Sequence, residues 1–196
     1  NLYCSHCYLD ASNRIAGLPD ELTTKECIRI IDQIAEVNRN PFLILTGGEP
    51  LLRDDIFDIA EYASRCGFFV VIGTNGLLLD DDIVKRIKER GVKGLGISID
   101  SISPYFHDTF RGVNGAWEST IQGIEAAKRA GLEFLIQTTV TRENYKEIPE
   151  IIEFSYKTCA RVFNLFFLVC TGRGEELTDI SAEQYEDMLS YVYKIH

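Results

Sequence analysis

Short apolar runs, each bounded by glycine or polar residues, recur along this chain of 196 residues. Their length and their content of β-branched and aromatic residues are typical of β-strands. Because the runs are almost continuously hydrophobic, we predict strands that are covered on both faces, as in parallel sheets. The predicted strands are residues 41–48, 67–76, 93–100, 132–140 and 161–169.

Amphipathic helical patterns lie between these runs. The first, TTKECIRIIDQIAEVN, places Ile30, Ile31, Ile34 and Val37 on one face and offers Thr23 or Thr24 as N-cap. Two later helices are predicted to end before glycines that suit the left-handed conformation, Gly67 and Gly91. These two patterns cover residues 54–67 and 80–91, and three further helical patterns cover residues 115–131, 144–159 and 181–196.

The repeated order of strand and helix predicts an α/β fold with parallel strands joined by right-handed crossovers. A doubly wound sheet and a (β/α) barrel both fit this order. No linker-like segment divides the chain, so we predict one domain over residues 1–196. A helix follows soon after the opening loop, and we therefore expect an incomplete (β/α)6 barrel whose first strand preceded Asn1 and is missing from this chain.

The composition and charge of the chain exclude some classes of function. A net charge of −10 argues against a nucleic-acid partner, which would need clustered Lys and Arg. The sequence has no apolar run of about 18 residues and no leader pattern, so we expect no membrane partner and a cytoplasmic protein. The six cysteines are expected to be reduced thiols, with Cys27 and Cys66 as small core residues.

Small, polar and acidic residues follow the predicted strands. In parallel α/β folds the carboxyl ends of the strands form the working face, so these residues are the first functional signal. Glycines among them would let a ligand touch the backbone. The segments are Gly47-Gly48-Glu49-Pro50, Thr74-Asn75-Gly76, Ser98-Ile99-Asp100, Gln137-Thr138-Thr139 and residues 170–174.

A pair of cysteines, Cys4 and Cys7, lies near the start of the sequence. A zinc ribbon would need a second ligand pair, which the sequence lacks. A thioredoxin-type redox motif and two uninvolved thiols both remain open. Gly47, Gly48 and Glu49 are either a turn before a helix or a cradle for a cationic amine.

Ser98 and Asp100 alternate along a predicted strand, so their side chains leave it on one face and suit the hydroxyls of a ribose. Neither a Gly-x-Gly-x-x-Gly fingerprint nor a Walker loop is present. In the predicted loop that follows, Asp108 and Arg111 are expected to form an ion pair or a helix cap, and His107 could carry a proton.

Taken in this order, the cysteines, Gly47–Pro50 and the Ser98/Asp100 pair resemble the radical S-adenosylmethionine superfamily. Its Cys-x-x-x-Cys-x-x-Cys motif would take Cys4 and Cys7 as the second and third cysteines, and the first would fall immediately before Asn1. The resemblance implies a [4Fe-4S] cluster whose fourth iron binds S-adenosylmethionine, and thiolates suit such a cluster.

The resemblance also implies cofactor contacts. The methionine amine would meet Gly47, Gly48 and Glu49, beside Pro50. Ser98 and Asp100 would meet the ribose or the carboxylate. The backbone around His6 and from Leu168 to Cys170 would line the adenine. An electron from a reductant such as flavodoxin or ferredoxin would then cleave S-adenosylmethionine to a 5′-deoxyadenosyl radical, which abstracts a substrate hydrogen.

Three stretches resemble the branch that modifies haem precursors: CSHCY, HDTFRG and FFLVCTGRGEEL. This branch is similar to peptide-maturing enzymes with a cysteine-rich (SPASM-like) extension, so a tetrapyrrole or a peptide substrate is expected. His6 and Ile44 count against the molybdopterin-precursor enzymes, which act on GTP. Thr74, Asn75 and Arg173 are expected to contact substrate, and a solvent-exposed Arg173 or a non-catalytic iron–sulfur domain remain as alternatives.

Overall fold

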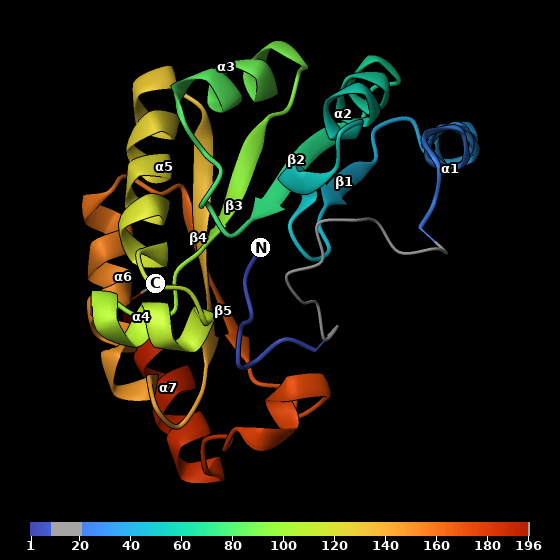
Figure 1. The fold of residues 1–196 in the computed structure, drawn as a ribbon. Helices are drawn as coiled ribbons and strands as arrows, with labels where there is room; N and C mark the ends of the chain where they lie inside the picture. Colours follow the sequence, from blue (N-terminus) through green and yellow to red (C-terminus); the bar gives the residue numbers. More distant parts are fainter. Residues whose placement is uncertain (9–20, 196) are drawn as a thin grey trace.

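The computed structural model describes residues 1–8 and 21–195, and in them one sheet of five parallel strands. The strands pair in chain order and form a curled half-barrel, with the helices on its outer face (Figure 1). This sequential order confirms the barrel-like fold over the doubly wound alternative, in which the strand order reverses. The strands are β1 (Phe42–Leu45), β2 (Phe69–Thr74), β3 (Gly94–Ser98), β4 (Glu133–Val140) and β5 (Val162–Phe167).

The helices of the repeating units begin and end where the sequence predicts, within a few residues. Thr23 forms a capping box with Glu26 at the first helix, and Gly67 and Gly91 have φ angles of 91° and 79°. These helices are α1 (Thr24–Val37), α2 (Ile56–Arg65), α3 (Asp81–Glu89), α5 (Ala116–Ala130), α6 (Ile148–Lys157) and α7 (Ala182–Ile195).

One further helix corrects the prediction of a loop after β3. α4 (Pro104–Arg111) begins at the N-cap Ser103, with proline in its first turn, and ends at Gly112 with φ 72°. Three short 3-10 helices were also not predicted: η1 (Pro50–Leu52), η2 (Tyr145–Glu147) and η3 (Gly172–Glu176). Both α4 and η3 contact the segment that carries Cys4 and Cys7.

The hydrophobic core lies between the outer face of the sheet and the helices. Every second strand residue points into it, as Ile72, Ile97 and Ile136 do. The expectation for α1 was partly wrong: Ile31 is buried, but Val37 is 86% exposed. The reason is that α1 packs on α2 at the β1 edge of the sheet, where less of a helix surface is covered (Figure 1). Cys27 and Cys66 pack against the core, as predicted.

The inner face of the sheet carries a different set of side chains. It presents polar residues on neighbouring strands, and Gln137 Nε2 donates a hydrogen bond to Ser98 Oγ at 3.0 Å. It also presents exposed apolar residues that alternate with core positions, among them Ile44 and Phe166. In the described part of the chain, no helix combines the length and apolar character that a membrane span requires.

Candidate functional site

Residues 1–8, called here the cysteine loop, lie across the carboxyl ends of the strands (Figure 1). Backbone hydrogen bonds join the loop to the end of α4: Tyr3 N donates to Arg111 O at 3.1 Å, and Ser5 N donates to Phe110 O at 2.9 Å. A turn closed by Cys7 N and Cys4 O places the two cysteines together. Both thiols are partly exposed.

The segment after β5 holds the cysteine loop from the other side. Arg173 donates from its backbone N to Cys7 O at 3.2 Å and from Nε to Cys4 O at 2.9 Å. Its guanidinium lies 4.0 Å from the centroid of the Tyr3 ring. Arg173 is therefore no simple solvent-exposed loop residue, and its contact with a substrate stays a prediction.

A buried ion pair lies beneath the loop. Arg111 pairs with Asp100, and Asp100 also accepts a hydrogen bond from Thr139 N at 2.9 Å. Burial raises the pKa of Asp100, but the Arg111 guanidinium, the two nearby histidines and the hydrogen bond from Thr139 N together outweigh burial and keep that pKa below its usual value. The prediction that Arg111 forms an ion pair is confirmed, whereas contact of Asp100 with a ribose stays a prediction.

Asp108 is confirmed as a helix cap. Its carboxylate accepts hydrogen bonds from Gly115 N at 2.6 Å and Trp117 N at 2.8 Å, at the start of α5. The N-cap residue of α5 is Gly115, which has no side chain to do this. One residue of α4 thus supplies the cap of α5.

Of the two described histidines, His107 is buried and His6 is half-buried. His6 stacks on Phe110 with ring centroids 4.6 Å apart, and burial lowers its pKa to about 4. Burial also lowers the pKa of His107 to about 4, and its Nδ1 accepts a hydrogen bond from Asp100 N. Because His107 is 1% exposed, packing explains its position better than proton transfer to solvent does.

Glu49 lies buried beside two exposed glycines, Gly47 and Gly48. Its carboxylate accepts hydrogen bonds from Thr74 Oγ1 and Asn75 N, both at 2.8 Å, and from Leu51 N at 3.2 Å. Burial raises the pKa of Glu49 despite these bonds.

Thr74 and Asn75 thus have a role that the sequence did not indicate, because they orient Glu49. The amide of Asn75 also donates to Asn1 Oδ1 at 2.8 Å, which joins the end of β2 to the cysteine loop. The Thr-Asn-Gly sequence directly after a strand was the available signal. Their predicted contact with substrate stays untested.

The other predicted cofactor residues lie around the same edge. Leu168 is buried, whereas the thiol of Cys170 is exposed. A Cβ added to Gly174 would lie 3.4 Å from the Leu168 side chain and 3.7 Å from His6 O, so these segments are close together. Pro50 is buried at the start of η1, directly after Glu49.

The residues present fit an iron–sulfur cluster with a bound amino acid. Two thiols lie in one loop, and Gly47 has φ 155° with nothing within 4 Å of an added Cβ, which leaves open space at the backbone of the segment that leads into Glu49. No group of three His, Cys, Asp or Glu residues within residues 1–8 and 21–195 is placed to hold a metal ion.

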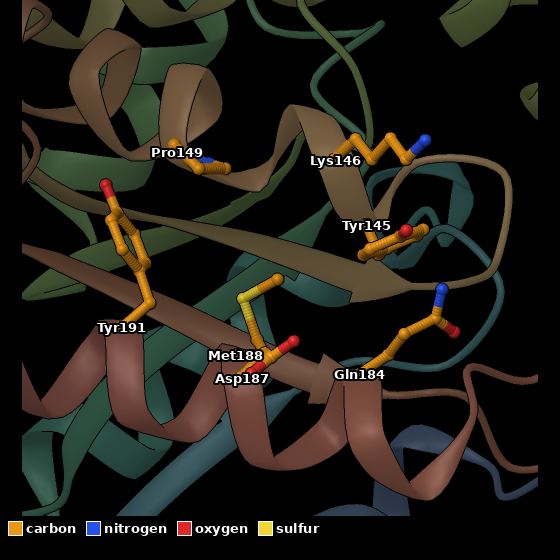
Figure 2. Close-up of a pocket in the computed structure, with 7 residues that line it drawn as sticks. All are labelled: Tyr145, Lys146, Pro149, Gln184, Asp187, Met188 and Tyr191. Carbon is orange, nitrogen blue, oxygen red and sulfur yellow. The ribbon is translucent and has the colours of Figure 1, made fainter.

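A separate pocket of about 180 Å³ lies between α7 and the η2–α6 segment. Figure 2 shows Tyr145 and Lys146 on one side of it and Met188 and Tyr191 of α7 on the other. None of the predicted site residues lines this pocket. The candidate site is therefore the strand edge beneath the cysteine loop.

Comparison with known proteins agrees with this geometry. The family model described as the Radical SAM superfamily matches residues 1–155. An AdoMet-dependent heme synthase of Methanosarcina barkeri is 42% identical over 195 residues, which is 100% of this chain and 55% of that protein. A pre-heme d1 synthase of Dinoroseobacter shibae is 36% identical over 176 residues, or 90% of this chain and 43% of that protein.

Among solved structures, Streptococcus suis SuiB bound to S-adenosylmethionine is similar in fold. Its TM-score is 0.80 at 20% identity, and the match covers 100% of this chain and 44% of SuiB. The chain spans about half the length of the curated relatives it matches.

Proposed function

Since the chain belongs to the radical S-adenosylmethionine superfamily, we propose that it is the core of an enzyme that modifies a haem precursor. The observation that carries the proposal is the meeting of two segments that are far apart in sequence. The Cys4–Cys7 turn and the Gly47–Glu49 segment are joined through the hydrogen bond between Asn1 and Asn75 and the bond from Asn75 N to Glu49. The two cysteine thiols and the Glu49 carboxylate thus share one edge of the sheet.

Each residue of this edge has a role in the proposal. Cys4 and Cys7 supply two thiolates to a [4Fe-4S] cluster. Glu49, oriented by Thr74 and Asn75, receives the amine of S-adenosylmethionine beside the exposed backbone of Gly47 and Gly48. Ser98 and Asp100 are the residues for its ribose or carboxylate.

When bound, the cluster supplies the electron that cleaves S-adenosylmethionine to a 5′-deoxyadenosyl radical. The chain's own contribution is binding, orientation and exclusion of water. The stack of His6 on Phe110 and the buried Leu168 provide an apolar wall at the cysteine loop. Such a wall limits the access of water and of competing hydrogen donors.

The substrate class rests on the names of the relatives, which are haem-pathway synthases at 42% and 36% identity. Exposed apolar residues on the inner face, such as Ile44 and Phe166, suit a flat macrocycle. Arg173 suits the propionates of a tetrapyrrole. A flavodoxin or ferredoxin is the proposed reductant, and the cytoplasm is the proposed compartment.

The test uses the full-length protein, reconstituted anaerobically with iron and sulfide. We expect a [4Fe-4S]⁺ electron paramagnetic resonance signal that shifts when S-adenosylmethionine is added. Cys4→Ala should lose this signal and most of its iron, whereas Cys66→Ala, at a partly buried core position, should keep both. A signal that ignores S-adenosylmethionine would contradict the proposal.

The substrate is tested separately. Propionate-bearing tetrapyrroles and short peptides are each incubated with the reduced enzyme and S-adenosylmethionine, and the products are analysed by mass spectrometry. We expect 5′-deoxyadenosine and a mass change in a tetrapyrrole. A mass change confined to a peptide would assign the chain to peptide maturation instead.

A further inference from the structure

Arg111 is the residue that most directly connects the protein interior with a cysteine of the loop. Its Nη1 lies 3.8 Å from Cys4 Sγ, and its Nη2 pairs with Asp100. Both side chains of the ion pair are at most 7% exposed. A buried guanidinium in this position is costly unless its donors meet acceptors, so its geometry is specified by the fold.

The backbone around Arg111 is equally involved. The carbonyls of Phe110 and Arg111 accept hydrogen bonds from Ser5 N and Tyr3 N, on both sides of Cys4. The next residue, Gly112, leaves no room for a side chain, because a Cβ there would lie 2.7 Å from Tyr3 O. The end of α4 is thus shaped to the cysteine loop.

The donors of Arg111 are incompletely used by the described residues. Arg111 Nε is buried without a hydrogen-bond partner among them, and the contact from Nη1 to sulfur is long. A thiol is a weak acceptor, whereas a metal-bound thiolate is an anion and accepts a stronger, charge-assisted bond. Binding of iron by Cys4 would give the guanidinium a second charged partner.

We propose that Arg111 is a positioning residue for the iron–sulfur cluster, which fixes the Cys4 thiolate and makes the cluster easier to reduce. The inference rests on the proposed function, since it takes Cys4 as a cluster ligand. A positive charge next to a coordinating sulfur favours the reduced cluster, which carries one more negative charge. Asp100 orients the guanidinium and offsets part of its charge.

The sign of this effect separates it from simple packing. Removing the charge of Arg111 should make the cluster harder to reduce, whereas removing that of Asp100 should make it easier. A loss of packing would instead affect both variants in the same direction, because each opens the same buried pair. Opposite shifts of the midpoint potential in the two variants would therefore show an effect of charge and not of packing.

The experiment compares full-length wild type, Arg111→Gln, Arg111→Lys and Asp100→Asn after reconstitution, without S-adenosylmethionine so that cofactor contacts do not enter. Reductive titration followed by electron paramagnetic resonance gives the midpoint potential, and iron analysis gives cluster content. For Arg111→Gln we expect the ratio of reduced to oxidised cluster at a fixed potential to fall about tenfold, equal to about 59 mV for one electron. Asp100→Asn should shift the opposite way, and Arg111→Lys should stay near wild type.

Arg90→Gln is the matched control, because Arg90 pairs with Glu61 between α3 and α2 and does not contact the cysteine loop. It should leave the potential unchanged. Unchanged potentials in Arg111→Gln and Asp100→Asn, or shifts of the same sign, would overturn the inference. Loss of iron from Arg111→Gln with retention in Arg111→Lys would support the positioning role. The effect of charge on the midpoint potential would then be measured with Asp100→Asn.

Failure of the proposed function has a different signature, since wild type itself would then take up no cluster or would carry a cluster whose signal does not respond to S-adenosylmethionine.

Discussion

At the scale of single residues, Gly172 and Gly115 share a left-handed backbone but differ in their surroundings. Gly172 has φ 58°, and a Cβ there would lie 2.6 Å from Cys7 O and 2.8 Å from Tyr8 O. Gly115 has φ 80° and nothing within 4 Å of an added Cβ. Alanine at Gly115 therefore meets only the backbone penalty of roughly 1–2 kcal/mol.

We predict that Gly172→Ala destabilises the protein more than Gly115→Ala does, because the new methyl group must displace the cysteine loop. Urea unfolding of both variants gives the difference in free energy of unfolding. Iron retention in the full-length protein should fall for Gly172→Ala alone. Equal unfolding free energies and equal iron content would contradict the contact between η3 and the loop.

The buried imidazole of His107 makes stability depend on pH. Because burial lowers the pKa of His107 to about 4, the unfolded chain binds a proton more readily between pH 6.5 and 4. The free energy of unfolding should therefore fall as pH falls through this window, by about 3 kcal/mol for a shift of this size. Above pH 7 the contribution is constant.

The measurement compares wild type with His107→Asn, whose amide oxygen can still accept from Asp100 N. The difference in free energy of unfolding between the two should shrink from pH 7 to pH 4. His6, which titrates in the same range, is present in both proteins and cancels. A difference that does not change with pH would contradict a neutral, buried His107.

Residue roles that depend on long-range contacts were the hardest to predict. The pairing of Arg111 was predicted, but the choice of Asp100 as its partner was not, since the two come together only when α4 folds back. Likewise Thr74 and Asn75 meet Glu49 from another strand. By contrast, Gly67 and Gly91 were predictable because helix ends are local.

At the scale of elements, α5 depends on α4 for its N-terminal cap. Asp108→Ala should cost about 1 kcal/mol, within the range of roughly 0.5–2 kcal/mol for lost caps, because Gly115 N and Trp117 N lose their acceptor. Asp108→Asn should retain most of this stability, since an amide oxygen can still accept. Urea unfolding of both variants checks the prediction.

An equal loss in both variants would show that charge and not the hydrogen bonds is responsible. Asp80→Ala serves as a comparison, because Asp80 caps α3 by accepting from Ile83 N at 2.7 Å. Its loss should also be about 1 kcal/mol.

Most elements followed from local sequence signals, and the exceptions have local reasons too. α4 has a serine cap, a proline in its first turn and a final glycine, but only eight residues, too few for a clear amphipathic pattern. For α1 the periodicity was correct and the extent of burial was not, because burial depends on how many neighbours the sheet edge provides.

At the scale of the whole molecule, the outer face of the sheet forms the core and the inner face is open to a ligand. Two consecutive phenylalanines lie on these opposite faces. Phe167 packs on Tyr185 of α7 with ring centroids 4.3 Å apart, on the core side. Phe166 points to the inner face and is 52% exposed.

We predict that Phe167→Ala costs about 2 kcal/mol of stability, less than for a fully buried phenylalanine, because Phe167 is partly buried against the core. Phe166→Ala should cost less than about 1 kcal/mol, because an exposed ring gains little from burial, but it should weaken tetrapyrrole binding by the full-length protein. Denaturant unfolding and absorbance titration measure the two effects. Weaker binding in Phe167→Ala but not in Phe166→Ala would contradict the assignment of the faces.

The order and direction of the strands were predictable at this scale, because near-continuous apolar strands alternating with helices imply parallel crossovers. The assembly of the site was less predictable from the sequence. The sequence placed small and polar residues at the strand ends, but it could not show that α4 and η3 both reach the cysteine loop, since neither element was predicted.

The contacts of the cysteine loop also bear on how the protein forms during synthesis. Each strand pairs with the next one along the chain, so the sheet can grow as the polypeptide leaves the ribosome. The bond from Arg173 Nε to Cys4 O, however, joins residues 169 positions apart. The thiols are therefore translated long before η3 exists, and the loop reaches its final shape only after β5 has joined the sheet. If Cys4 and Cys7 hold the proposed cluster, iron is best delivered at that late stage.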